Sequence, residues 1–140
     1  MRYWDASALV ALCVAEAATA TLRQLVAGGI VTWSVSAVEI ASAIERRTRE
    51  GGLTSAERAT ARSTLAELSA AWTDISALGP VRDRALRLIA AHPLRAADAM
   101  QLAAALVAVT DRPDGHVFVC TDLRLRGAAA REGFRVLPPA

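Results

Sequence analysis

Short strand-favouring runs alternate with longer helical segments along all 140 residues, and this alternation constrains the fold more than any other feature of the sequence. The clearest strand is Val117–Cys120, a run of apolar, strand-favouring residues that follows a turn. Strands that alternate with helices require crossover connections, which place the strands parallel, with helices on both faces of the sheet. The sequence therefore predicts an α/β fold, a three-layer α/β/α sandwich with a central, mainly parallel sheet of four to five strands.

Capping residues and glycine pairs place the other elements. The segment Thr54-Ser55-Ala56-Glu57 has the pattern of a capping box, and Gly28-Gly29 and Gly51-Gly52 predict helix ends. The predicted strands are residues 2–4, 30–33, 73–75, 117–120 and 135–137; the predicted helices are residues 7–28 with a break near 16–19, 34 or 36 to 50, 55–72, 80–91, 93–109 and 123–132. No linker or composition shift indicates a second domain, so residues 1–140 are predicted to form one domain.

The composition excludes a disordered chain and several classes of enzyme. Hydrophobic residues make up 54% of the sequence, and all 16 basic residues are arginine. The lack of lysine excludes chemistry that needs a Schiff-base lysine, a phosphate-loop lysine or the lysine of a phosphoaspartate receiver. A net charge of +2 is too small to indicate a nucleic-acid partner by itself.

Cysteine usage and hydropathy favour a cytoplasmic protein. Cys13 and Cys120 lie far apart without C-x-x-C spacing, which favours free thiols in a reducing compartment over a disulfide. Residues 6–15 are apolar and precede a small-residue motif at 18–20, but Glu16 interrupts the run, so no secretory signal is expected. No run approaches the ~18 apolar residues that a membrane span requires, and no membrane contact is expected.

Four acidic residues occupy positions that suggest a site. Asp5 follows the first predicted strand and Asp122 follows the strand at 117–120, and ligands of parallel sheets bind beyond the carboxyl ends of strands. Glu39 and Asp98 interrupt apolar helical stretches, where an unpaired buried carboxylate is costly. Each also has a simpler explanation: Asp98 as a first-turn residue stabilised by the helix dipole, and Glu39 as part of a solvated helix face.

Converging carboxylates repel one another, so either their pKa values rise or a hard cation lies between them. Mg²⁺ and Mn²⁺ prefer oxygen ligands and keep open positions for water and phosphate. Such a site lowers the pKa of a bound water and stabilises charge on a leaving oxygen, which is the chemistry of phosphodiester cleavage. His92 and His116 are expected to be structural or solvated and not metal ligands.

Four segments together resemble the PIN-domain family, and specifically its VapC-type toxin ribonucleases of toxin–antitoxin pairs. The resemblance covers essentially the whole chain. It is carried by the order and spacing of Tyr3-Trp4-Asp5-Ala6-Ser7-Ala8-Leu9-Val10, Val38-Glu39-Ile40, Leu94-Arg95-Ala96-Ala97-Asp98-Ala99-Met100-Gln101-Leu102-Ala103, and Asp122 with Gly127-Ala128-Ala129-Ala130-Arg131-Glu132-Gly133-Phe134.

The resemblance implies an α/β/α sandwich and a metal-dependent endoribonuclease site with Mg²⁺ or Mn²⁺ as cofactor. Ser7 matches a hydroxyl residue common in the family, which either orients Asp5 or caps the first helix. Cys120 stands where the family often has serine or threonine, and the adjacent Thr121 would point the other way in a regular strand. The residues implied to bind metal and activate water are Asp5, Glu39, Asp98 and Asp122.

The arginines suit an RNA substrate. When the four acids are left out of the count, the sequence has 16 arginines and 10 acidic residues, and this excess of positive charge favours binding of a polyanion such as RNA. Arg95, three residues before Asp98, is a candidate phosphate contact or an ion-pair partner of Asp98, and Arg46 lies two helical turns after Glu39. Few aromatic residues are available for base stacking, so recognition of RNA shape and backbone is expected. Further candidates for substrate contacts, antitoxin contacts or solvated positions are Arg124, Arg126 and Arg131.

Protein partners are also expected. The helical segments 6–20 and 55–72 are rich in alanine and leucine, which suggests excess apolar surface or simply alanine tolerated on exposed faces. The family resemblance favours a homodimer and a cognate antitoxin that blocks the acidic site. The alternative function is a non-catalytic PIN-like module that binds RNA or an antitoxin, but four costly acids retained together favour the enzyme.

Overall fold

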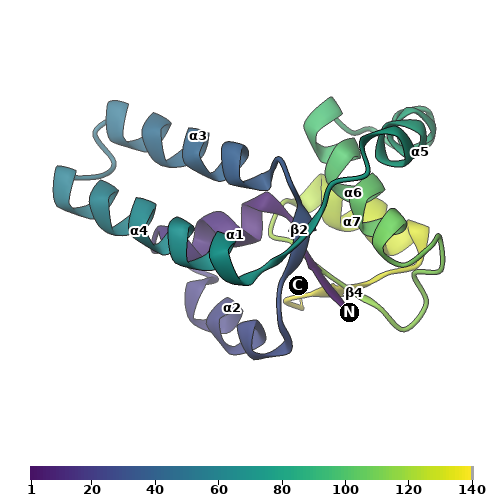
Figure 1. Cartoon of the computed structure of the whole chain (residues 1–140), viewed down its shortest axis with the longest axis horizontal. Helices are drawn as coiled ribbons and strands as arrows, with labels where there is room; N and C mark the ends of the chain where they lie inside the picture. Colours follow the sequence, from purple (N-terminus) through teal and green to yellow (C-terminus); the bar gives the residue numbers. More distant parts are fainter. Residues whose placement is uncertain (140) are drawn as a thin grey trace.

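The computed structural model describes residues 1–139 and contains a five-stranded parallel sheet between two layers of helices (Figure 1). Ala140, the last residue of the predicted domain, lies outside the described residues. The predicted three-layer α/β/α sandwich is confirmed. The strands, in the spatial order β3-β2-β1-β4-β5, are β1 (Arg2–Trp4), β2 (Val31–Trp33), β3 (Thr73–Ile75), β4 (Val117–Val119) and β5 (Arg135–Leu137).

The strand order reverses beside β1, and this reversal places the functional site. From β1 the chain builds outward through β2 and β3, and it then returns to add β4 and β5 on the other side of β1. Trp4 pairs with Val119, and the backbone N–H of Asp5 donates to the carbonyl of Val119 at 3.0 Å. Ligands bind at such a switch point, in the crevice beyond the carboxyl ends of the strands.

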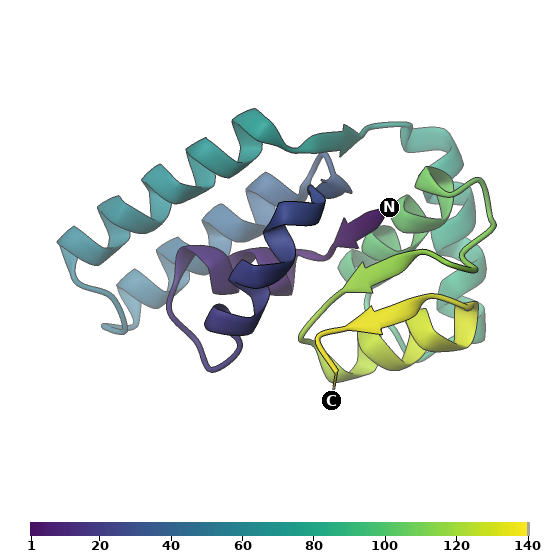
Figure 2. The ribbon, with the colours of Figure 1, turned by 90° about the horizontal axis from the view of Figure 1, so that it is seen from below.

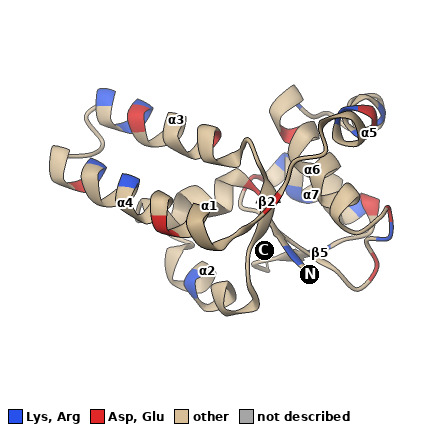
Figure 3. Ribbon diagram, viewed as in Figure 1, with Lys and Arg blue, Asp and Glu red and all other residues tan. Residues whose placement is uncertain are grey.

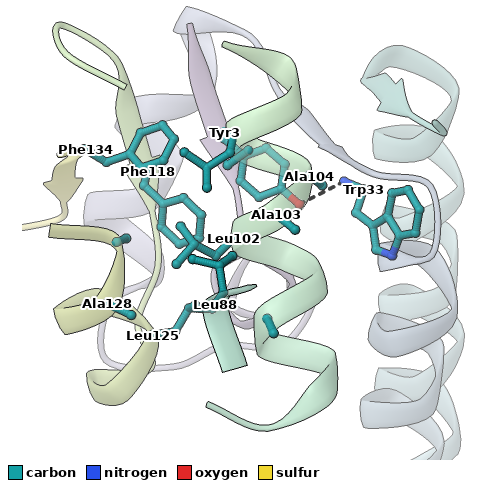
Figure 4. Packing of buried hydrophobic residues seen from close by; sticks show 14 of the residues in the cluster. Tyr3, Trp33, Leu88, Leu102, Ala103, Ala104, Phe118, Leu125, Ala128 and Phe134 are labelled. Atoms are coloured by element: carbon teal, nitrogen blue, oxygen red, sulfur yellow. Dashed lines mark hydrogen bonds between the residues drawn. The ribbon is translucent and has the colours of Figure 1, made fainter. Parts of the chain in front are cut away.

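Strand alternation divides the core into two clusters, because successive side chains point to opposite faces of the sheet. Tyr3 and Phe118 pack in the cluster beneath α5, α6 and α7, where their rings stack with centroids 5.3 Å apart (Figure 4). Trp4 and Val119 pack in the other cluster, beneath α1 to α4. Figure 2 shows the two layers of helices on either side of the strands.

The helices follow the predicted segments, with different boundaries at three of them. The first predicted helix is two α-helices and a 3₁₀ turn. The helix predicted from Pro80 begins two residues earlier, and the one predicted from Pro93 begins only at Ala96, because Arg95 is extended and forms its N-cap. The elements are α1 (Ala6–Cys13), α2 (Thr19–Leu25), η1 (Val26–Gly28), α3 (Ser36–Arg49), α4 (Ser55–Ala71), α5 (Leu78–Ala91), α6 (Ala96–Ala108) and α7 (Leu123–Glu132).

The pair α3 and α4 extends away from the sheet, and basic and acidic positions occur along both helices (Figures 1 and 3). The predicted capping box opens α4: Thr54 accepts from the N–H of Glu57, and the Glu57 carboxylate accepts from the N–H of Thr54. Glu45 of α3 binds Arg58 of α4 at 2.9 Å, which ties the two helices together.

Exposed large apolar side chains lie elsewhere than the sequence predicts. Most of α1 is buried, and Leu65 of α4 is buried as well, so the segments 6–20 and 55–72 present no excess of large apolar surface. Of the two interpretations of these segments, excess apolar surface is wrong and alanine tolerated on exposed faces is the one observed, because their exposed positions are mainly alanine or polar. The exposed large hydrophobic residues are Met1, Val35, Val38, Leu78, Leu86, Ile89 and Leu123. Among residues 1–139, no helix is long and apolar enough to cross a bilayer.

Candidate active site

The four predicted acids all lie at the beginnings of helices. Asp5 is the N-cap of α1 and Asp122 is the N-cap of α7, whereas Glu39 and Asp98 lie in the first turns of α3 and α6. In a parallel sheet, the helix that follows a strand begins at the carboxyl edge, as α1, α3 and α7 do. α6 follows α5 and leads into β4, so it begins at the same edge, where Asp98 lines the same cavity as the other three acids. The positive ends of the helix dipoles favour negative charge at these positions.

Asp5 is the most buried and most constrained of the four acids, with 3% of its surface exposed. Its Oδ2 atom accepts from the backbone N–H of Ser7 at 3.0 Å and from the Ser7 hydroxyl at 2.5 Å. The helix cap is therefore Asp5 and not Ser7, and of the two roles predicted for Ser7 the structure shows the contact with Asp5. The serine hydroxyl orients the aspartate.

Cys120 takes part in the same contacts. Its Sγ lies 3.5 Å from Asp5 Oδ2 and 3.7 Å from the Ser7 hydroxyl, so the thiol contacts the aspartate at the position where a hydroxyl is common in the resembled family. The backbone N–H of Thr121 donates to the Ser7 hydroxyl at 3.2 Å. β4 ends at Val119, so regular alternation does not continue to Thr121. The outward orientation expected of Thr121 in a regular strand therefore does not apply, and Thr121 lines the cavity described below.

Glu39 is half-buried and is held by a partner that the sequence did not suggest. The Gln101 amide Nε2 donates to Glu39 Oε1 at 3.1 Å, from a side chain that is completely buried. The interpretation of Glu39 as part of a solvated face is therefore wrong. The available signal was one carboxamide residue within the apolar helical stretch 96–108. Asp98 is also half-buried, and its first-turn position agrees with the helix-dipole explanation.

All four acids line one cavity of about 620 Å³, here called the acidic cavity. A second cavity of about 610 Å³, the arginine-lined cavity, shares Asp98, Thr121 and Asp122 with it and adds Arg95 and Arg124. Asp98 and Asp122 therefore lie between two hollows with different linings, whereas Asp5 and Glu39 line only the first. The residues of the acidic cavity are Asp5, Ala6, Ser7, Val10, Glu16, Val38, Glu39, Ser42, Ala43, Arg46, Arg47, Asp98, Thr121 and Asp122.

The pKa values of these acids are raised by burial and by one another. Burial raises the pKa of Asp5 to about 6, against the hydrogen bonds from Ser7, and the charge of Asp98 adds to the rise. Burial raises the pKa of Glu39 to about 7, with further contributions from Asp5 and Asp98, while the Gln101 hydrogen bond opposes the shift. The pKa of Asp98 is raised by burial and then by the charge of Asp122. The carboxylates are thus close enough to repel one another.

The donor set suits a hard divalent cation, although the side chains are not gathered into a preformed metal centre. Within residues 1–139, no three His, Cys, Asp or Glu side chains form such a cluster. Four carboxylates on one cavity are nevertheless the oxygen ligands that Mg²⁺ and Mn²⁺ prefer. The hydrogen bonds of Asp5 fall on Oδ2 and that of Glu39 on Oε1, so among the described residues each keeps a second oxygen without a hydrogen bond. A cation bound there would also relieve their mutual repulsion.

The predicted arginines divide into cavity residues and structural residues. Arg46 lines the acidic cavity, and Arg95 and Arg124 line the arginine-lined cavity. No ion pair joins Arg95 to Asp98 within residues 1–139, although the charge of Arg95 opposes the rise in the pKa of Asp98 that burial and Asp122 cause. In contrast, Arg126 donates to the carbonyls of Cys120 and Pro138, and Arg131 donates to His92, so both take part in contacts within the fold.

Residues 2–110 match the PIN domain family, a segment that contains Asp5, Glu39 and Asp98 and ends before Asp122. The chain belongs to the PIN-domain family. It is similar to Ribonuclease VapC45 of Mycobacterium tuberculosis (strain CDC 1551 / Oshkosh) and to Ribonuclease VapC49 of Mycobacterium tuberculosis (strain ATCC 25618 / H37Rv). Each is 34% identical over 138 residues, which cover 97% of this chain and 94% of the relative. This PIN-domain chain is therefore VapC-like along nearly its whole length, as its four motifs predict.

Proposed function

We propose that this PIN-domain protein is a metal-dependent endoribonuclease that acts as the toxin of a toxin–antitoxin pair and hydrolyses RNA phosphodiester bonds. One observation carries the proposal: four carboxylates from four helix N-termini line a single cavity at the switch point of the sheet. The similar proteins are named ribonucleases of the VapC type, which supports RNA as the substrate and an antitoxin as the partner.

Asp5, Glu39, Asp98 and Asp122 would hold Mg²⁺ or Mn²⁺. The bound ion supplies a lowered pKa for an attacking water and stabilises negative charge on the leaving oxygen. The protein itself positions the ligands: Ser7 and Cys120 hold Asp5, and the helix dipoles favour the ionised form of all four acids. Thr121, beside Asp98 and Asp122, is a supporting residue on the cavity wall.

The arginines on both sides of the acids would bind phosphates that flank the bond to be cut. Arg46 lies on the acidic cavity, and Arg95 and Arg124 lie on the neighbouring one, with Asp98 and Asp122 between them. None of these guanidinium groups pairs with an acid within residues 1–139. An RNA strand that contacts both cavities has nucleotides on each side of the acids. This arrangement favours cleavage within the RNA and not at its end.

A homodimer and a bound antitoxin are part of this proposal, as is a cytoplasmic location. The exposed apolar residues support protein contacts on two elements outside the segments that the sequence suggested. Val35 and Val38 lie at the beginning of α3, beside the acidic cavity, whereas Leu86 and Ile89 lie on α5. Such side chains are suitable for burial against a partner.

The deciding test is a calorimetric titration of the purified protein with Mg²⁺ and Mn²⁺, with RNA cleavage assayed in parallel. We expect the wild type to bind the ions and to cut RNA, and we expect Asp5→Asn to lose both properties. Asp83→Asn, a matched substitution of an exposed residue on α5, is the control and should behave as the wild type. Antitoxin-free wild-type protein that binds no metal and cuts no RNA would overturn the proposal in favour of a non-catalytic binding module.

A further inference from the structure

A chain of buried hydrogen bonds runs from the centre of the sheet to the acidic cavity. The backbone N–H of Trp33 donates to the Tyr3 hydroxyl at 3.1 Å (Figure 4), and that hydroxyl donates to Gln101 Oε1 at 2.6 Å. The Gln101 amide Nε2 then donates to the Ser36 hydroxyl at 3.0 Å and to Glu39 Oε1 at 3.1 Å. Tyr3, Ser36 and Gln101 are each completely buried.

The direction of this chain is determined by its first donor. A backbone N–H can only donate, so the Tyr3 oxygen accepts from Trp33 and its single proton goes to Gln101. The Gln101 carbonyl oxygen must therefore face Tyr3, which leaves both amide protons for Ser36 and Glu39. A flipped amide would place its NH₂ group against the Tyr3 O–H, so that two donors meet, and its oxygen against the Glu39 carboxylate, so that two acceptors meet. The hydrogen bonds to Tyr3 and to Glu39 would both be lost.

This arrangement couples two of the four acids through one helix. Asp98 and Gln101 are three residues apart on α6, so the helix that carries Asp98 also holds the carboxylate of α3. Glu39 has no other hydrogen-bond donor among residues 1–139. Its side chain would otherwise be free to leave the cavity, since it lies only half-buried in the first turn of α3.

We propose that Gln101 is a positioning residue that holds the Glu39 carboxylate in the acidic cavity, ready to bind a divalent cation. The proposal rests on the proposed function for its last step, because the cation belongs to that function. A purely structural role, in which Gln101 only satisfies the buried Tyr3 hydroxyl, would leave the Glu39 contact without consequence.

The hydrogen bond itself can be observed without metal or RNA. The sequence contains two glutamines, Gln24 and Gln101, and no asparagine, so the side-chain carboxamide region of a ¹H–¹⁵N spectrum should contain two NH₂ pairs. Gln24 is exposed on α2, so its pair should exchange with water faster than that of Gln101. We expect Glu39→Ala to shift the Gln101 pair and to leave the Gln24 pair in place.

The consequence for metal is measured by Mn²⁺ titration of Gln101→Met, which keeps an unbranched side chain of similar size but removes the donor. We expect a loss of Mn²⁺ affinity of roughly 10–100-fold, the usual effect of removing a residue that orients a metal ligand. Gln24→Met is the matched control and should bind as the wild type. Tyr3→Phe, which frees the Gln101 amide to rotate without touching Glu39, should cause a smaller loss in the same direction.

A second control separates positioning from general disruption of the core. Thr32→Val breaks a buried hydrogen bond to Ser36 in the same network but leaves the contact between Gln101 and Glu39. Equal losses of Mn²⁺ affinity in Thr32→Val and Gln101→Met would overturn the proposal, as would an unchanged Gln101 resonance in Glu39→Ala. If Gln101→Met does not fold, the spectra of Glu39→Ala and Tyr3→Phe decide. A wild type without Mn²⁺ binding would instead refute the proposed function, while the spectra still decide whether Gln101 holds Glu39.

Discussion

The acidic residues at the two ends of α6 and α7 differ in the direction in which the fold shifts their pKa values. At the beginning of these helices, Asp98 and Asp122 face the acidic cavity, and burial and the charge of Asp122 raise the pKa of Asp98. At the other end, Asp111 follows α6 and Glu132 is the last residue of α7. Hydrogen bonds from Arg84 lower the pKa of Asp111, and those from Arg87 and His92 lower the pKa of Glu132.

The helix dipole alone would lower the pKa values at the N-terminal end and raise them at the C-terminal end, because it favours negative charge at the N-terminus and disfavours it at the C-terminus. The hydrogen-bond partners of each acid have a larger effect than the dipole. Arg84 binds Asp111 through two hydrogen bonds of 2.6 and 2.7 Å, and His92 lies 2.6 Å from Glu132. The cavity acids have one another as neighbours instead. The paired acids at the C-terminal ends therefore stabilise the fold. In the cavity acids at the N-terminal ends, burial and mutual repulsion disfavour the ionised form.

The largest effect, on RNA cleavage, is expected from substitutions that remove the charge of an acid in the acidic cavity. Asp5→Asn and Asp98→Asn should each lower RNA cleavage by about 100-fold or more, since losing a metal ligand removes several kcal/mol of transition-state stabilisation. The fold should survive, with equal or greater stability, because a repulsive charge is removed. Cleavage rates and thermal unfolding of the same preparations check both parts. Cleavage retained by both variants would refute the assignment of the site.

The second prediction concerns the pH dependence of stability in metal-free protein. Asp5 has a pKa of about 6 and Glu39 of about 7, above their unfolded values near 4. In that interval the native state binds more protons than the unfolded state, so the free energy of unfolding falls as pH rises from about 4 to about 7. Asp5 contributes on the order of 2 kcal/mol to this fall.

Urea unfolding at several pH values measures the fall. Asp5→Asn should show a shallower decrease than the wild type between pH 4 and 7, roughly by the Asp5 contribution. Saturating Mn²⁺ should raise the free energy of unfolding at pH 7 in the wild type, because it binds only the folded state. Identical pH profiles for the wild type and Asp5→Asn would show that Asp5 is not destabilised in the folded protein.

The third prediction concerns Glu132, the paired acid at the C-terminal end of α7. Glu132 is 14% exposed and contacts both Arg87 and His92, so Glu132→Gln should lower the free energy of unfolding by about 1–2 kcal/mol. RNA cleavage should stay as in the wild type, since the residue lies at the end of α7 away from Asp122. Denaturant unfolding and a cleavage assay test the two statements. Glu67→Gln, at an exposed position of α4, is the control and should change neither.

The smallest effect is expected at the surface contact between α3 and α4. Arg58 binds Glu45 at 2.9 Å, but 44% of the Arg58 side chain is exposed, and exposed ion pairs contribute little to stability. Arg58→Met should lower the melting temperature by no more than about 3 °C. Calorimetry at moderate salt measures the shift. A shift several times larger would mean that the exposure of an ion pair does not indicate how much it contributes to stability.

The boundaries of most elements could be predicted from local signals. The apolar run at Val117 and the capping box at Thr54 each act within a few residues, and both are found in the structure. Helix beginnings near prolines were predicted less well, because proline restricts its own backbone without identifying the capping residue. Arg95 is such a case, since its place as the N-cap of α6 depends on the path of the chain after His92.

The sequence by itself determined the alternation of strands and helices, and with it the position of Asp5 and Asp122 at the carboxyl edge of a parallel sheet. That outcome follows from short-range patterns, because a residue directly after a strand lies at the same edge in every crossover unit. Glu39 and Asp98 were found by the apolar helical stretches that they interrupt and by the family resemblance. Only the tertiary structure decided that Cys120 contacts Asp5 and that Gln101 holds Glu39. These partners are 115 and 62 residues apart along the chain, and only packing brings their side chains together.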